Sequence, residues 1–305
     1  WEVIKDGVKT ESGKMNPVDL APNQKTVITI PYNKNLDAGS EYFLNLSFSL
    51  RKDASWAKAG HTVAAEQFAL NRRLPLTAVN TSAMQNVVTS VDGDNLIIGG
   101  ADFKTVFNTQ TGIMTSLQYN AKEMIFNNNG FNLNWYRSVN NDKYTDQNYY
   151  PTTNDKPAFT YQTAADGKSV TVISSTTATI NSEKPVRVPY LVKYVIYADG
   201  TIDVDASFTS PQDGRIIHRL GLQVVLPEDM ENIRYYGRGP HENYWDRKHS
   251  AFFGQYATTV KGMEEEHYVR AQSMGNRDDV RWVSITNQSG QGLKISSKDL
   301  SLIHI

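Results

Sequence analysis

The sequence predicts an all-β protein, and three observations support this fold class. First, apolar residues alternate with polar ones: between residues 44 and 50, Asn45, Ser47 and Ser49 separate leucine and phenylalanine side chains. A period of two is typical of a strand with one buried face. Second, Asp-Gly and Thr-Gly pairs, which favour tight turns, separate such runs. Third, no segment has a long helical period with capping residues at its ends. We therefore expect antiparallel sheets and only short helical turns.

The expected strands follow from these patterns in chain order. A β-branched run, Thr-Val-Ile-Thr-Ile at residues 26–30, lies between Pro22 and Pro31. Residues 190–208 read as a hairpin around Asp199-Gly200. Further strands are expected at residues 44–50, 170–173, 221–226 and 281–285. Turns are expected at Asp6-Gly7, Asp92-Gly93, Thr111-Gly112, Asp166-Gly167 and Asp213-Gly214.

A length of 305 residues is enough for roughly two domains with substantial cores. The composition changes near residues 71–75, so we place a domain boundary between residues 72 and 73. Residues 1–72 hold three or four expected strands, too few for a complete sandwich. Residues 73–305 then form one large β domain.

Composition excludes several classes of function. The 31 Lys and Arg residues balance 32 Asp and Glu residues, which argues against nucleic acid and against a membrane surface as partners. No run reaches the roughly 18 apolar residues of a membrane helix. There is no cysteine, and the six histidines lack the spacing of metal ligands, so no cofactor or metal is predicted. Because the chain begins at Trp1, without an initiator Met, we expect it to be a piece of a longer one.

The densest group of chemically capable side chains lies at residues 237–247, Gly-Arg-Gly-Pro-His-Glu-Asn-Tyr-Trp-Asp-Arg. Gly237 and Gly239 permit a positive φ, and Pro240 fixes the next turn, so we expect a sharp bend. Carboxylates beside aromatic rings suit sugar binding, because the oxygens accept from hydroxyl groups and the rings stack on apolar sugar faces.

A structural role for the same carboxylates is the alternative, and the residues alone favour it. Glu242 and Asp246 would each pair with Arg238, Arg247, Arg137 or a backbone N–H and fix the loop.

Residues 237–247 closely resemble the Gly-x-Gly-Pro-x-Glu-Asn-Tyr-x-Asp-Arg signature of family 2 glycoside hydrolases of the bacterial β-galactosidase type. Residues 1–7, 18–22 and 54–70 resemble strands of the immunoglobulin-like domain that precedes the signature domain in that family. The segment Trp135-Tyr136-Arg137, with Asn141-Asp142 after it, resembles a second family segment, although Ser138-Val139 replaces Ala-Pro. Residues 268–277 resemble a third, from which Ala271, Ser273 and Met274 depart.

The resemblance implies a truncated immunoglobulin-like β-sandwich at residues 1–72. It implies a large antiparallel β-supersandwich, similar to galactose mutarotases, at residues 73–305. The second would be the small-chain domain of a β-galactosidase, truncated at its C-terminus. The expected function is the non-catalytic C-terminal portion of a retaining enzyme that hydrolyses terminal β-galactosides, shaping the active-site rim and the assembly.

The two catalytic glutamates of the family lie in an upstream (β/α)8 barrel, and this chain has no alternating strand-helix region. We therefore expect no catalytic residue here and no activity of the fragment alone. By the same resemblance, divalent or monovalent cations belong to the missing barrel. The expected partners are that barrel, a β-galactoside substrate and, left open, further copies of the chain.

The candidate sugar-facing or domain-interface residues are Arg137, Asp142, Arg238, His241, Glu242, Tyr244, Asp246 and Arg247. Among them Arg238, His241 and Tyr244 are expected to face outward. Two alternative functions remain: a stand-alone carbohydrate-binding module of mutarotase-like fold, and an active mutarotase-like epimerase. The epimerase is disfavoured because His241 and Glu242 are neighbours that would point to opposite faces of an extended segment. The compartment is open between bacterial cytoplasm and periplasm.

Overall fold

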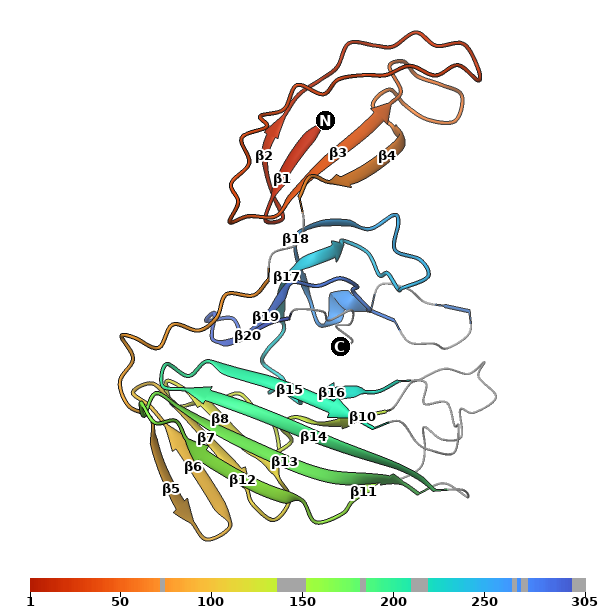
Figure 1. Cartoon of the computed structure of the whole chain (residues 1–305). Helices are drawn as coiled ribbons and strands as arrows, with labels where there is room; N and C mark the ends of the chain where they lie inside the picture. Colours follow the sequence, from red (N-terminus) through yellow and green to blue (C-terminus); the bar gives the residue numbers. More distant parts are fainter. Residues whose placement is uncertain are drawn as a thin grey trace. The chain divides into compact units, whose positions relative to one another are not determined.

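The structure, a computed structural model, describes residues 1–71, 75–135, 152–181, 185–209, 219–264, 268–269 and 274–297. Within these ranges it contains strands β1 to β20 and one short 3-10 helix, Lys261–Met263, so the all-β prediction is confirmed (Figure 1). The chain forms two compact units. Unit 1 comprises Trp1–Thr77, Glu231–His267 and Met274–Ile305, and unit 2 comprises Ala78–Met230 and Tyr268–Ser273.

Unit 1 begins with a four-stranded antiparallel sheet, which we call the first sheet. Its strands are β1 (Glu2–Lys5), β2 (Val8–Ser12), β3 (Tyr42–Ser49) and β4 (Thr62–Ala69), in the order β2-β1-β3-β4. Alternation along β3 sends side chains to both faces. Tyr42 and Leu44 pack with Val3 on one face, and Phe43 packs with Ile4 on the other.

Residues 26–30 were expected to be a strand, and this prediction is wrong for the structure. No secondary structure is assigned there, and Val27 is 93% exposed. Ile30 nevertheless packs against the cluster around Val3. A strand exists only when a neighbouring strand pairs with its backbone, and none of the strands in the described ranges pairs with this run.

A second four-stranded sheet completes unit 1. Its strands are β17 (Asn232–Gly239), β18 (Phe252–Thr259), β19 (Trp282–Thr286) and β20 (Gly292–Ser296), in the order β18-β17-β19-β20. Ile4 and Phe43 of the first sheet share a buried cluster with Tyr236 and Phe253 of the second. The rings of Phe43 and Phe253 stack with centroids 4.6 Å apart. The two sheets therefore share one core.

Unit 2 is a sandwich of two five-stranded antiparallel sheets. One sheet runs β5 (Val88–Asp92), β6 (Asn95–Gly99), β7 (Phe103–Asn108), β8 (Ile113–Tyr119), β9 (Lys122–Glu123). The other contains β11 (Thr152–Asn154), β12 (Ala158–Thr163), β13 (Ser169–Ile180), β14 (Val186–Tyr197) and β15 (Ile202–Phe208). A two-stranded ribbon joins β10 (Asn132–Asn134) to β16 (Gly221–Gln223).

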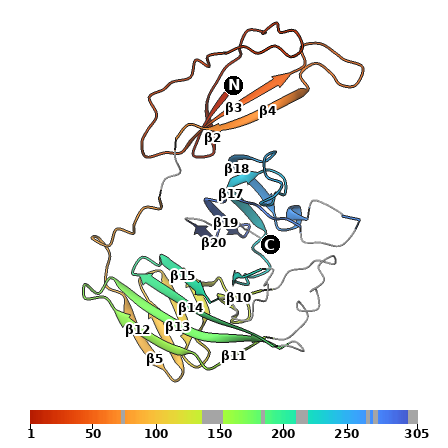
Figure 2. The same ribbon diagram turned by 45° about the vertical axis from the view of Figure 1, so that its right-hand side comes forward.

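The two sheets of unit 2 pack face to face, as Figures 1 and 2 show. Every second residue of β14 is buried, including Val188. β13 follows the same alternation, with Val172 among its buried residues, except at Thr176, which is partly buried. Phe107 of β7 meets Tyr194 of β14 edge to face, with ring centroids 5.1 Å apart. Burial of alternate side chains between two sheets is how a sandwich forms its core.

Most of the expected turns join consecutive strands. Gly7, Gly93, Gly112, Gly167 and Gly200 all have positive φ at such turns. The strand expected at 221–226 is shorter, Gly221–Gln223, and Asp213-Gly214 lies outside the described residues. The boundary between residues 72 and 73, with its two named domains, stays a prediction. By compactness the chain divides after Thr77, and residues 231–267 and 274–305 group with the first sheet.

Candidate functional site

The signature segment starts inside a strand. Gly237 and Gly239 belong to β17 and do not have positive φ, so the expected conformational reason for these glycines is wrong. Glycine is needed at both positions because neighbouring atoms leave no room for a side chain. A Cβ on Gly237 would lie 2.9 Å from the Cα of Val280, and a Cβ on Gly239 would collide with the Tyr235 hydroxyl. Only glycine allows neighbouring chain segments to approach β17 this closely.

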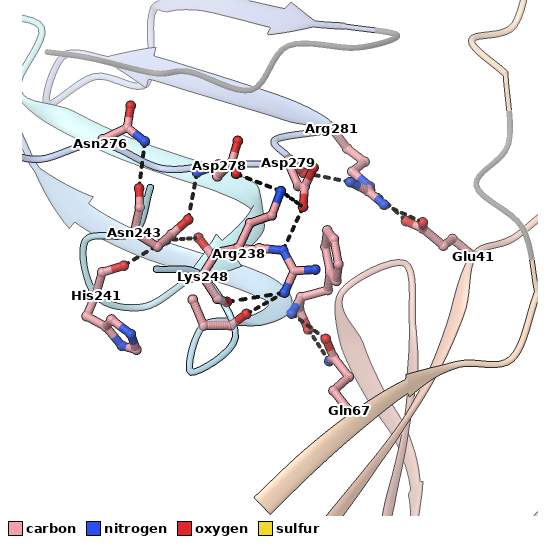
Figure 3. Close-up of polar contacts among 12 residues, drawn as sticks. Glu41, Gln67, Arg238, His241, Asn243, Lys248, Asn276, Asp278, Asp279 and Arg281 are labelled. Carbon is pink, nitrogen blue, oxygen red and sulfur yellow. Dashed lines mark hydrogen bonds and ion pairs between the residues drawn. The ribbon is translucent and has the colours of Figure 1, made fainter. Parts of the chain in front are cut away.

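The loop that follows, residues 240–248, is fixed by Asn243, which is fully buried. Its Nδ2 donates to the carbonyl oxygens of Arg238 (3.1 Å) and His241 (2.9 Å), and its Oδ1 accepts from the Asp278 N–H at 2.8 Å. Its own N–H donates to the Asn276 carbonyl (3.0 Å), and Asn276 Nδ2 donates back at 2.6 Å (Figure 3). One amide therefore joins this loop to a second segment, residues 274–281.

Glu242 is paired as expected, whereas Asp246 is not. The Glu242 side chain is 3% exposed, forms an ion pair with Arg247 and accepts from the Gly275 N–H at 2.6 Å. Asp246 is exposed, and among the described residues no hydrogen bond or ion pair involves its carboxylate. The structural prediction is thus right for Glu242 and wrong for Asp246. A carboxylate surrounded by water needs no partner, because solvent satisfies it.

Arg238 was expected to face outward, and the structure corrects this. Its Nε donates to Asp279 Oδ2 at 2.6 Å, and its Nη1 donates to the Ala251 carbonyl at 3.0 Å. Only 22% of its side chain is exposed. Lys248 Nζ lies 3.2 Å from the same Asp279 oxygen and 2.8 Å from Asp278 Oδ2. Two cations and two carboxylates therefore form one network beneath the loop.

This network shifts the ionisation of its members. Burial raises the pKa of Asp279, but the hydrogen bond from Arg238 and the charge of Lys248 outweigh it, so the pKa lies below its ordinary value. Burial lowers the pKa of Lys248, but Asp278 and Asp279 outweigh that effect and raise it. Both groups are therefore charged at neutral pH.

The outer side of the loop carries a different set of side chains. Trp245 is 83% exposed, with Lys248 Nζ 4.9 Å from its ring centroid. Arg247 lies over the Tyr244 ring at 4.8 Å. His241 is exposed, with Nε2 3.0 Å from the Ser250 hydroxyl. Ring, carboxylate and imidazole groups are thus presented to solvent on a fixed backbone.

Of the remaining candidates, Arg137 and Asp142 lie outside the described residues. Sequence reasoning missed Trp245, which occupies a variable position of the signature, and also Asn243, Lys248 and Asp279. Asn243 is part of the signature, and an amide at a fixed position of the signature was a usable signal for a buried connector. Nothing local marks Asp279 as the partner of Arg238, because the two are far apart in sequence.

Arg238 also lines a small cleft of about 160 Å³. The walls of this cleft come from the first sheet, from β17 and β18 and from the loop between those two strands; they are Phe43, Glu66, Gln67, Ala69, Arg238, His249, Phe252 and Phe253. In the part of the chain that the structure describes, no group of three or more His, Asp or Glu side chains could hold a metal ion. No helix there is long and apolar enough to cross a membrane.

Comparison with known proteins agrees with the resemblance of the signature. The family model described as "Beta galactosidase small chain" matches residues 99–304, and the model described as "Beta-galactosidase, domain 4" matches residues 1–71. The β-galactosidase of Priestia megaterium is 29% identical over 302 residues, which cover 97% of this chain and 28% of that protein. That of Halalkalibacterium halodurans is 28% identical, covering 93% of this chain and 28% of its own length.

The chain therefore spans a little more than a quarter of the length of these relatives. The small-chain model alone covers more than half of the 305 residues. The chain belongs to the β-galactosidase small-chain family, with a β-galactosidase domain 4 region at its start.

Proposed function

We propose that this chain is the non-catalytic C-terminal portion of a retaining β-galactosidase of glycoside hydrolase family 2, which hydrolyses terminal β-galactosides. The relatives bear that name and are more than three times as long. A retaining glycosidase needs two carboxyl groups about 5–5.5 Å apart at one site. Glu242, the buried acid of the signature, is committed to Arg247 and Gly275 and is not available for that role.

One observation supports a role for this portion at the rim of the active site. The loop at residues 240–248 is fixed by buried contacts on one side and presents polar and aromatic groups to solvent on the other. Asn243 and Glu242 fix the backbone that carries Trp245, Asp246 and His241 before any ligand arrives. A backbone that is already in place loses little entropy on binding. In the full enzyme this loop would form part of the rim around the sugar, with catalysis in the barrel.

The supersandwich, mutarotase-like description of residues 73–305 belongs to the same proposal. It is supported by the antiparallel sandwich of unit 2 and by the small-chain match. A stand-alone carbohydrate-binding module is the second candidate. The observation that favours it is the exposed pair Trp245 and Asp246, which can contact a sugar without any other domain.

The first test compares this chain with the full-length protein on a nitrophenyl β-galactoside. The chain alone should show no turnover, and the full-length protein should be active. Turnover by purified chain, abolished by a point change within residues 1–305, would contradict the proposal. A chain that binds galactose as tightly as the full-length protein would favour the module.

The second test separates the two roles of the signature carboxylates in the full-length protein. Asp246→Asn should raise KM about tenfold and leave the melting temperature unchanged, because its carboxylate contacts only solvent. Glu242→Gln should lower the melting temperature, because it removes a buried charge from its partners. Asp92→Asn, at an exposed residue of unit 2, is the control and should change neither quantity. An unchanged KM for Asp246→Asn would remove this residue from the rim.

A further inference from the structure

A buried ion pair joins the first sheet to the segment that holds the loop. Glu41, immediately before β3, is 5% exposed. It accepts from Arg281 Nη2 at 2.6 Å and from Arg281 Nε at 3.0 Å, one bond to each carboxylate oxygen. The Tyr236 hydroxyl donates to it at 2.5 Å. A two-point pairing between guanidinium and carboxylate fixes orientation as well as distance.

Arg281, oriented in this way by Glu41, also contacts the backbone of Asp279. Its third donor, Nη1, donates to the Asp279 carbonyl oxygen at 2.7 Å. Asp279 has a φ of +52°, in the left-handed region that is uncommon for residues other than glycine. Arg281 is therefore one of the groups that hold the Asp279 backbone in place.

Asp279 in turn fixes the two cations beneath the loop. Its carboxylate binds Arg238 Nε at 2.6 Å and Lys248 Nζ at 3.2 Å, and the Lys248 ammonium lies over the Trp245 ring. A continuous series of contacts thus runs from Glu41 through Arg281, Asp279 and Lys248 to the exposed Trp245 (Figure 3 shows all but the last contact).

Other contacts hold the two sheets together independently of Glu41. Gln67 accepts from the Phe253 N–H at 2.7 Å and donates to the Phe253 carbonyl at 3.0 Å. Gln255 Nε2 donates to the Asp6 carbonyl at 2.8 Å, and the Gln255 N–H donates to the Gly7 carbonyl at 2.9 Å. Loss of the Glu41 charge therefore leaves the two sheets in contact and affects mainly the Asp279 backbone, which Arg281 holds.

We propose that Glu41 is a positioning residue for the loop at residues 240–248. It acts through Arg281 and Asp279, so the first sheet sets the geometry of the surface that carries Trp245 and Asp246. The functional meaning of this role rests on the proposed function, in which that surface is part of the sugar site. The physical coupling does not depend on it.

The test uses the 305-residue chain with 5-fluorotryptophan, observed by fluorine NMR, and amide hydrogen exchange. Trp245→Phe assigns the Trp245 signal. Glu41→Gln should shift or broaden that signal while leaving the signal of Trp56, an exposed residue after β3, unchanged. In Glu41→Gln the backbone amides of Asn243 and Asp278 should exchange with solvent about tenfold faster than in the native chain. This increase should exceed any increase in the amides of the β19–β20 ladder.

Three further variants make the result specific. Glu2→Gln removes a partly exposed carboxylate of the same sheet that pairs with Lys9, and should leave the loop unchanged. Tyr236→Phe removes one hydrogen bond to Glu41 but keeps the two bonds between Arg281 and Glu41, so the loop should again stay unchanged. Arg281→Lys keeps the charge but loses the two-point pairing. It should reproduce the loop effect, and it tests the same coupling if Glu41→Gln does not fold.

The proposal would be overturned if, in both Glu41→Gln and Arg281→Lys, the amide exchange rates of the loop rise no more than those of the β19–β20 ladder. In the full-length protein Glu41→Gln should raise KM several-fold with kcat nearly unchanged. A changed loop with unchanged KM would refute the rim role while leaving the positioning role intact. An unchanged loop would refute the positioning role whatever the kinetics.

Discussion

Single side chains help to hold the loop after β17 by bonding to its backbone groups. Asn243 uses both ends of its amide to satisfy the carbonyl oxygens of Arg238 and His241 and the N–H of Asp278. Glu242 similarly accepts the Gly275 N–H. Buried backbone groups in an irregular loop must find such partners, because water does not reach them. The loop therefore keeps its shape although its own secondary structure is limited to turns and an isolated bridge between Tyr244 and Arg247.

Asn243→Ala should lower the free energy of unfolding of unit 1 by about 2–4 kcal/mol, because it leaves several buried backbone groups without partners. Asn16→Ala, at an exposed position, should change it by less than about 0.5 kcal/mol. Chemical denaturation followed by circular dichroism measures both. A loss for Asn243→Ala no larger than that of the control would contradict its connecting role.

Asp279 gives the fold a defined acid sensitivity. Its pKa is lowered in the folded state, because the Arg238 and Lys248 contacts outweigh the effect of burial. Its stabilising contribution is therefore complete above the unfolded pKa of about 4 and is lost as the pH falls through the lower folded value.

Asp279→Asn should destabilise unit 1 by about 1–3 kcal/mol at pH 7. It should also flatten the loss of stability as the pH falls below about 4, since the amide takes up no proton. Denaturation midpoints measured at several pH values test this. Equal pH dependence of variant and native chain would show that Asp279 does not contribute to it.

At the scale of elements, the turn between β1 and β2 contacts the second sheet of unit 1 directly. Gly7 has a φ of +81°, and a Cβ there would lie 2.7 Å from the Tyr236 ring and 2.9 Å from the Gln255 backbone nitrogen. Gly60 has a similar φ of +88° but nothing within 4 Å of its added Cβ. A substitution at Gly60 therefore measures the cost of the left-handed backbone alone, whereas one at Gly7 adds the steric cost of the neighbouring sheet.

Gly60→Ala should cost about 1 kcal/mol, from the left-handed backbone alone. Gly7→Ala should cost about 1–3 kcal/mol more, because the added methyl group displaces the second sheet. Thermal unfolding of both variants gives the difference. Equal costs would mean that the turn does not approach β17 and β18 as closely as described.

The sequence predicted those elements whose partners lie nearby in the chain. The hairpin at residues 190–208 appears as β14 and β15, since alternation and the Asp199-Gly200 turn specify it locally. Residues 26–30 have an equally good pattern but no strand, because pairing is a property of two segments. For the same reason the signature predicted a bound Glu242 but not its partner Gly275, and a charged Arg238 but not its inward orientation.

At the scale of the whole chain, unit 1 is assembled from segments that lie far apart in sequence, whereas unit 2 is nearly continuous. Deleting residues 1–71 should lower the unfolding temperature of the second sheet strongly. It exposes the apolar side chains of Tyr236 and Phe253 to water and removes Glu41, the ion-pair partner of Arg281.

The transition of unit 2 should change little, so calorimetry of the intact chain should show two transitions, of which the deletion shifts one. Retention of both transitions at their original temperatures would mean that the two sheets of unit 1 are independent.

The discontinuity of unit 1 also has a consequence for biosynthesis. Glu41 and Arg281 are 240 residues apart in the sequence. At about 5–20 residues per second, a ribosome takes roughly 10 to 50 s to synthesise that interval. For most of this time the first sheet has been synthesised while Phe43 and Glu41 lack their partners, and unit 2 is synthesised and can fold in between. The nascent chain thus exposes an apolar face and an unpaired acid until the second sheet of unit 1 has been synthesised.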